Sequence, residues 1–179
     1  MLSDRKTNIL AILPYPVFPA KMGGQKAIAL FYRNLKNYLP VTLVGTKNNE
    51  VSKEELQPLP LLRNSFLRYM DLGLFFKLKK LIKQQEISHL IIEHPYYGWL
   101  GLLLQKTTKV SLIVRSHNIE SLRFKSTGKW WWGVLWNYEK WVHGNAAINF
   151  FITENDLQFA VKNYKVKSKT AHVITYGFE

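Results

Sequence analysis

The chain contains no cysteine among its 179 residues, which excludes disulfide bonds, thiolate metal ligands and a thiol nucleophile. It also lacks any run of about 18 apolar residues, so the sequence predicts no membrane-spanning helix. Residues 1–8 are polar and the apolar run after them is short, so a secretory signal peptide is not expected. Together these absences favour a cytoplasmic protein.

Acidic residues are scarce, with 12 Asp and Glu against 25 Lys and Arg, for a formal net charge of +13. A surplus of this size favours polyanionic partners such as nucleic acid, anionic lipid or phosphate-bearing substrates. The densest basic group is Lys77, Lys79, Lys80 and Lys83 on one predicted helix, where a solvated face is the simpler interpretation. No nucleic-acid recognition motif accompanies the charge, so we expect no nucleic-acid partner.

Several catalytic motifs are also missing. The chain has no Gly-x-Gly-x-x-Gly dinucleotide fingerprint, no Walker phosphate loop and no Gly-x-Ser-x-Gly nucleophile elbow. Its five histidines do not show the spacing of metal ligands. We therefore expect no bound metal and no cofactor.

Short apolar runs alternate with helical patterns along the whole chain. This alternation predicts an α/β fold, a Rossmann-like three-layer sandwich with a mostly parallel sheet of about seven strands. Strands are expected at 9–13, 40–45, 58–62, 88–93, 110–114, 147–152 and 170–175. Helices are expected at 27–35, 72–82, 99–104, 130–142 and 154–164.

Ligands of parallel α/β sheets collect outside the carboxyl ends of the strands, so the residues after each strand are the candidates for chemistry. Gly23 and Gly24 lie between the first strand and the first helix. They can adopt positive φ, and without side chains they let a ligand approach the backbone. The free N–H groups of a helix start bind anions, phosphate above all. A plain turn is the alternative interpretation.

The segment 115–120 is the richest strand end, with a fixed cation, an imidazole, an amide and a carboxylate within six residues. His117 is placed either to handle a proton or orient a sugar hydroxyl, or to serve as a structural histidine. Glu93 and His94 end the preceding strand and point to opposite sides, so they need not act together.

Five of the six tryptophans fall within a short stretch: Trp130, Trp131, Trp132, Trp136 and Trp141. On a helix these rings surround most of the circumference, so they cannot all face one sheet. One interpretation is a bilayer interface, with Arg123, Lys125, Lys129 and Lys140 facing anionic headgroups. The other is core packing on one side and contact with a further domain on the other.

In order along the chain, several segments resemble the amino-terminal domain of family 4 glycosyltransferases, which are retaining enzymes of the GT-B fold. The matching pieces are Leu13-Pro14-Tyr15-Pro16 with Pro19 and Gly23-Gly24, then Leu90–His94, Val114–Glu120 and Val173–Glu179. The last piece is similar to the family's interdomain linker, with Tyr176 in place of the usual asparagine and Glu179 in place of aspartate.

The resemblance implies a role for each strand end. Gly23 and Gly24 would bind the donor diphosphate, and His117 would be the catalytic residue beside the transferred sugar. The acceptor cleft would be lined by Gln25, His94, Arg115, Asn118 and Glu120.

The resemblance further implies one domain over residues 1–175 and the start of the linker at 176–179, with the carboxy-terminal nucleotide-sugar domain absent. We therefore expect the acceptor-binding half of an enzyme that moves a sugar from a nucleotide sugar to a lipid-linked or polysaccharide acceptor. The half alone is expected to be inactive. It is expected to be cytoplasmic, either free or peripheral on the inner membrane face. The alternative is a non-catalytic module that docks on a membrane or protein through residues 130–141.

Overall fold

The computed structural model describes residues 6–51 and 56–176, and its centre is one seven-stranded sheet in which every neighbouring pair is parallel. The strand order is β3-β2-β1-β4-β5-β6-β7. This confirms the predicted α/β class. The strands are β1 (Ile9–Ile12), β2 (Val41–Thr46), β3 (Leu59–Leu62), β4 (His89–Glu93), β5 (Ser111–Ser116), β6 (Ile148–Phe151) and β7 (Ala171–Val173).

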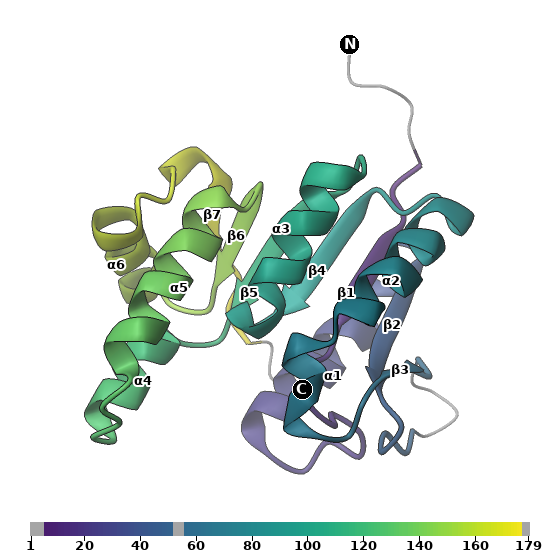
Figure 1. The fold of residues 1–179 in the computed structure, drawn as a ribbon, viewed down its shortest axis with the longest axis horizontal. Coiled ribbons are helices and arrows are strands. Elements are labelled where there is room, and N and C mark those ends of the chain that lie inside the picture. Colours follow the sequence, from purple (N-terminus) through teal and green to yellow (C-terminus); the bar gives the residue numbers. More distant parts are fainter. Residues whose placement is uncertain (1–5, 52–55, 177–179) are drawn as a thin grey trace.

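Helices cover both faces of the sheet, as Figure 1 shows with α2, α3 and α5 in front and α1 behind. The α-helices are α1 (Gly23–Leu35), α2 (Leu72–Gln84), α3 (Gly98–Thr107), α4 (Glu120–Ser126), α5 (Trp132–Asn145) and α6 (Glu154–Tyr164). Three short 3₁₀ turns join them: η1 (Phe66–Met70), η2 (Pro95–Tyr97) and η3 (Ser168–Thr170).

Alternate residues of the central strands serve two different cores, because successive side chains of a strand point to opposite faces. In β1, Leu10 and Ile12 pack toward α2 and α3, whereas Ile9 and Ala11 pack toward α1. All four are buried, which is why the strand reads as a continuous apolar run. A third cluster joins α6 to the β6–β7 end of the sheet.

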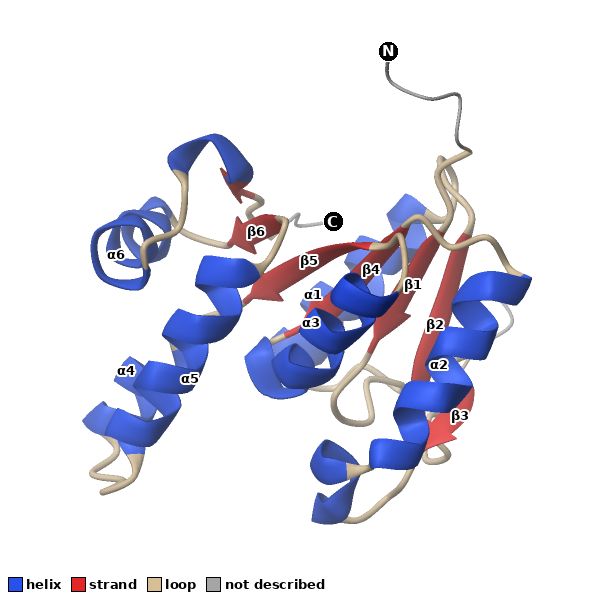
Figure 2. Cartoon of the chain, turned by 45° about the horizontal axis from the view of Figure 1, so that its top comes forward, coloured by secondary structure: helices blue, strands red, loops and turns tan. Residues whose placement is uncertain are grey.

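One helix was not predicted from the sequence. The α4 helix has seven residues, too few for a 3.6-residue repeat to be recognised, and it lies beside α5 (Figure 2). The helix expected from Trp130 instead begins at Trp132, so that Trp130 belongs to the turn between α4 and α5.

Of the predicted linker, Tyr176 is described, whereas 177–179 lie outside the described residues. Within 6–51 and 56–176, no helix combines the length and the hydropathy needed to cross a bilayer.

Candidate active site

The carboxyl ends of β1, β4 and β5 meet because these three strands are neighbours in the sheet. A cavity of about 820 Å³ opens there. Gly24 and His117, predicted from separate strand ends, lie on its wall together. The full lining is Tyr15, Gly24, Phe66, Arg68, Tyr69, His94, Tyr96, His117, Asn118, Glu120, Arg123, Phe124, Trp131, Leu135 and Tyr176.

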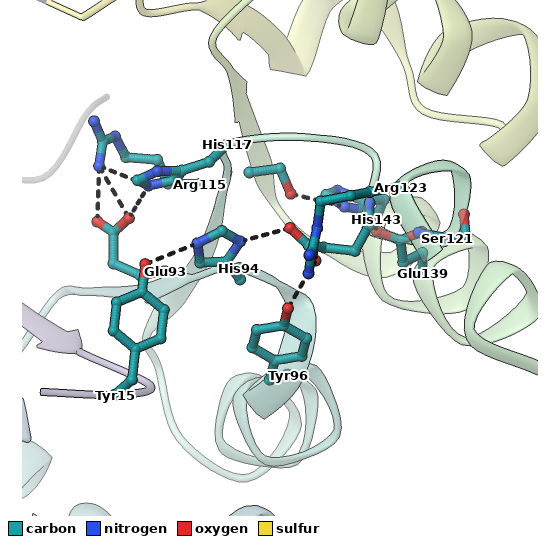
Figure 3. A network of polar contacts seen from close by, with 12 residues as sticks. Tyr15, Glu93, His94, Tyr96, Arg115, His117, Ser121, Arg123, Glu139 and His143 are labelled. Atoms are coloured by element: carbon teal, nitrogen blue, oxygen red, sulfur yellow. Dashed lines mark hydrogen bonds and ion pairs between the residues drawn. The ribbon is translucent and has the colours of Figure 1, made fainter. Parts of the chain in front are cut away.

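A buried carboxylate, Glu93, joins three partners behind the cavity wall, of which Figure 3 shows Arg115 and His117. The parallel register of β4 and β5 places it directly beside Arg115, whose Nη1 lies 2.9 Å from Oε2. His117 Nε2 lies 2.7 Å from the same oxygen, and the Tyr32 hydroxyl donates to Oε1 at 2.7 Å. Burial alone would raise the pKa of Glu93, but these partners lower it from 4.5 to about 2.

The contacts of His117 define its tautomer. Nε2 lies 2.7 Å from Glu93 Oε2, which only accepts, and 3.2 Å from Arg115 Nη1, which only donates; because the contact with the carboxylate is the shorter, we assign the proton to Nε2. Nδ1 then accepts from the Tyr176 hydroxyl, whose oxygen lies 2.9 Å away. Burial lowers the pKa of His117 and the carboxylate opposes this, with a net lowering that favours the neutral form of the oriented imidazole.

His94 presents a second imidazole to the same cavity, stacked on His117 with ring centroids 4.4 Å apart. Its Nε2 lies 3.3 Å from the Tyr15 hydroxyl (Figure 3), and its Nδ1 lies 3.2 Å from Glu120 Oε1 without the angle of a hydrogen bond. The backbone of His94 has φ 60°, a conformation that a residue with a side chain rarely adopts. Such strain at the rim of a cavity is typical of functional positions.

Glu120, the first residue of α4, is the second buried carboxylate of the site. Its Oε2 accepts from the Tyr96 hydroxyl at 2.7 Å and from Arg123 Nε at 3.0 Å. Burial opposes ionisation, yet the contacts with His94 and Arg123 lower the pKa of Glu120 to about 2. Two imidazole–carboxylate pairs therefore lie side by side, with the histidines on the cavity wall.

The position of α4 depends on a residue that the sequence analysis did not single out. Glu139 of α5 is buried and accepts from the backbone N–H groups of Glu120 and Ser121, both at 2.9 Å. The Tyr164 hydroxyl donates to the same carboxylate at 2.9 Å. Burial raises the pKa of Glu139, against the effect of these donors. A carboxylate from one helix thus caps the N-terminus of another, as the helix dipole favours.

The di-glycine segment forms the first turn of α1, and among the described residues only Gly128 is a glycine with positive φ. Gly23 and Gly24 therefore do not use the positive φ that glycine allows. A Cβ on Gly23 would meet no atom within 4 Å, and one on Gly24 would meet only the Tyr15 hydroxyl, at 3.6 Å. What the glycines provide is open space in front of the helix N-terminus.

Two residues predicted for the acceptor cleft are placed elsewhere. Gln25 accepts from the backbone N–H groups of Lys21 and Met22 and donates to Pro16 O, so it holds the loop before α1. Arg115 is buried over the Phe31 ring, on the wall of a separate cavity of about 280 Å³. The predicted residues that line the main cavity are Gly24, His94, His117, Asn118 and Glu120.

The five clustered tryptophans do not all lie on one helix, because α5 contains only Trp132, Trp136 and Trp141. Trp131 lines the cavity beside Phe124, and Trp136 packs edge-on against Tyr164. Trp132 lies under the ammonium group of Lys125, 4.5 Å from its ring centroid. Only Trp130 and Trp141 are classed as exposed, with exposed fractions of 88% and 47%.

Aromatic residues of the cavity were the main omission of the sequence analysis. Tyr15 and Tyr96 each follow a strand end within a proline-containing segment, a signal that was present but not used. Phe66, Arg68 and Tyr69 come from η1, which follows the edge strand β3, and the carboxyl end of that strand was not singled out as a site. Within the described part of the chain, no three His, Asp or Glu side chains gather as metal ligands would, and the absence of a metal stays a prediction.

A parallel α/β domain with a ligand cavity at the carboxyl edge of its sheet is the class that this geometry defines. The sequence model of Glycosyltransferase Family 4 matches residues 24–179, so the chain belongs to this family. A search of curated proteins finds no match.

Solved structures give the same fold. Sucrose-phosphate synthase from Thermosynechococcus elongatus superposes with a TM-score of 0.72 at 12% identity, over 96% of this chain and 49% of that one. A glycosyltransferase from Rickettsia africae ESF-5 gives 0.64 at 17% identity, over 97% and 44%. The catalytic domain of starch synthase IV from Arabidopsis thaliana, bound to ADP and acarbose, gives 0.62 at 11% identity, over 97% and 52%. The chain spans about half the length of these structures, and its fold is that of the N-terminal domain of GT-B glycosyltransferases.

Proposed function

We propose that this domain binds the acceptor of a retaining glycosyltransferase and contributes one wall of the site where a nucleotide sugar donates its sugar. The observation that carries the proposal is the shared cavity of Gly24, His94 and His117 at the carboxyl edge of the sheet. The ADP and acarbose bound by starch synthase IV support a nucleotide and a sugar as the ligands of this fold.

The donor diphosphate is proposed to lie at the N-terminus of α1. The first N–H groups of a helix have no partner within it, and they carry partial positive charge. Because the space in front of Gly23 is open, phosphate oxygens can approach these groups closely. Charge that develops on the leaving diphosphate would be stabilised there.

His117 is proposed as the residue that faces the transferred sugar. Its Nε2–H is committed to Glu93, so Nδ1 is the nitrogen available to a sugar hydroxyl, in place of the Tyr176 hydroxyl that it now accepts. The acceptor would bind across His94, Asn118 and Glu120, where aromatic rings offer stacking faces for a saccharide and Arg68 and Arg123 offer charge for an anionic group.

The test is sugar transfer by this domain joined to a second GT-B domain, with nucleotide sugars and saccharide or lipid-linked acceptors. We expect His117→Ala to lower kcat by at least about 100-fold, whereas Arg63→Ala, an exposed control, leaves it unchanged. The anomeric configuration of the product, read by NMR, decides whether transfer is retaining. Transfer that is unaffected by His117→Ala would contradict the proposed role. We expect the present chain alone to bind acceptor without transferring sugar.

A second candidate is a non-catalytic module that docks through residues 130–141. The exposure of Trp130 favours it, but Trp131 and Trp136 are engaged by Phe124 and Tyr164. Exposed tryptophans therefore occur at the two ends of this segment rather than as one face. Loss of membrane or protein binding in Trp130→Ser, with transfer intact, would favour the docking module.

A further inference from the structure

A different surface carries more exposed apolar side chains than the tryptophan segment. We define the η1–α2 patch as Phe66, Leu67, Met70, Leu72 and Phe76. Each of these side chains is between 60% and 76% exposed. They fall within eleven consecutive residues, and a concentration of this kind marks an interaction site rather than the scattered apolar residues of an ordinary surface.

The η1 part of the patch is held in place by its polar groups. Arg68 Nε and the Tyr69 hydroxyl both donate to Pro14 O, at 3.0 and 3.1 Å, and Trp99 Nε1 donates to Tyr69 O at 2.8 Å. Phe66 packs edge-on against Tyr69. The apolar side chains are therefore displayed to solvent by an anchored turn, which argues against their being a frayed end of the core.

The exposed stripe of α2 changes from apolar to basic along the helix. Leu74, Leu78 and Ile82 face the core, while Leu72 and Phe76 face outward in the first half. The second half of the exposed surface carries the lysines, and α2 contains no acidic residue. These lysines, all exposed, are Lys77, Lys79, Lys80 and Lys83.

We propose that the η1–α2 patch inserts into the headgroup–acyl boundary of an anionic lipid bilayer, with the four lysines at the level of the headgroups. At about 1.5 Å per residue, Lys80 and Lys83 lie roughly 6 to 10 Å along the helix axis from Phe76. The ammonium groups therefore lie within about two helical turns of the exposed apolar side chains, close enough for one membrane surface to contact both.

The charge of the patch favours lipid over a protein partner. Lysine is depleted in protein–protein interfaces, whereas at a bilayer its methylene stem lies along the acyl boundary and its ammonium reaches the phosphates. The net charge of +13 adds a general attraction to an anionic surface.

The patch is also continuous with the cavity, because Phe66 belongs to both. If the proposed function holds, a lipid-linked acceptor would reach the cavity from the bilayer at this point. The docking itself does not depend on sugar transfer and can be measured without it.

The experiment is co-sedimentation of the chain with vesicles of phosphatidylcholine, with or without about 30 mol% phosphatidylglycerol, at low and high salt. We expect binding to the anionic vesicles that weakens steeply with salt. Lys77→Gln with Lys80→Gln and Lys83→Gln should lower the partition coefficient about 100-fold. Leu67→Ser with Phe76→Ser should lower it at least about tenfold, since both side chains lose their insertion energy.

Matched controls locate the effect on the molecule. Replacing Lys162, Lys167 and Lys169 by Gln removes the same charge near β7, at the opposite edge of the sheet, and should leave most of the binding. Amide exchange in residues 66–76 should slow on vesicles even without any substitution. The proposal is overturned if anionic vesicles do not bind the chain at low salt, if the control triple variant loses as much as the patch variant, or if Trp130→Ser abolishes binding while Leu67→Ser with Phe76→Ser does not.

Discussion

Replacing Arg115 by leucine tests whether the Glu93–Arg115 ion pair supports the site. The substitution keeps apolar bulk over Phe31 but removes the cation 2.9 Å from a buried carboxylate. Loss of one partner of a buried pair leaves an uncompensated charge and costs about 3 to 5 kcal/mol. The unfolding free energy should therefore fall by that amount near neutral pH.

The pH dependence distinguishes this cause from a simple packing defect. In the unmodified chain the pKa of Glu93 is lowered from 4.5 to about 2, so its contribution of roughly 3 kcal/mol is present above about pH 4.5 and is lost as pH falls toward 2. Removing Arg115 takes away the largest of the effects that lower the pKa of Glu93, so we expect burial to raise that pKa in the variant. The variant is then most stable when Glu93 is protonated, so its deficit should grow as pH rises.

Urea unfolding followed by circular dichroism at about pH 5 and about pH 8 measures both effects. The double variant Arg115→Leu with Glu93→Gln should recover part of the loss, because it removes the unpaired charge. The matched control is Arg63→Leu, which removes a solvent-exposed arginine from an ion pair with Asp71 and should cost less than about 1 kcal/mol. A deficit in Arg115→Leu that is below about 1 kcal/mol, or that does not change with pH, would refute this explanation.

Two further predictions concern buried groups beside the site. Glu139→Gln should destabilise the chain by about 1 to 3 kcal/mol in urea unfolding, because an amide nitrogen would face one of the two α4 N–H donors that the carboxylate now accepts; an unchanged midpoint would contradict the capping role. His143 is buried between Ser116 and Asn149, and burial lowers its pKa from 6.5 to about 4. The unfolded chain therefore takes up this proton first, and stability should fall by up to about 3 kcal/mol as pH drops through that window. His143→Gln, which keeps the polar contacts, should flatten that part of the curve of unfolding free energy against pH, and an unchanged slope would assign it to other groups.

The arrangement of the sheet was predictable because its strands are buried on both faces. Ile9–Ile12 and His89–Glu93 are short apolar segments bounded by turn residues, and such segments separated by helical patterns specify a parallel sheet. Boundaries differ by one or two residues, as at β7. The α4 helix could not be found in this way, because its N-terminus is capped by Glu139, a residue 19 positions further along the chain from Glu120.

The sequence predicted where the site lies in the fold, but not which of its side chains contact one another. Position after a strand identified His94, His117 and Glu120 individually. The pairing of Glu93 with Arg115 could not be predicted, because it depends on how β4 and β5 are aligned in the sheet. The sequence places each residue near the end of its strand but does not give this alignment. The family resemblance assigned Arg115 to the acceptor cleft, but its side chain is buried beside Glu93.

His94 keeps an unfavourable backbone conformation beside His117. A side chain held at φ 60° costs on the order of 1 to 3 kcal/mol, a cost that glycine would avoid. Glycine, however, has no ring to place between the Tyr15 hydroxyl and Glu120, or to stack on His117. The strained backbone is fixed from both sides, by the His94 N–H donating to Arg115 O and by the start of η2 at Pro95. Since stability alone would favour glycine here, the strain argues that the imidazole itself is what the position requires.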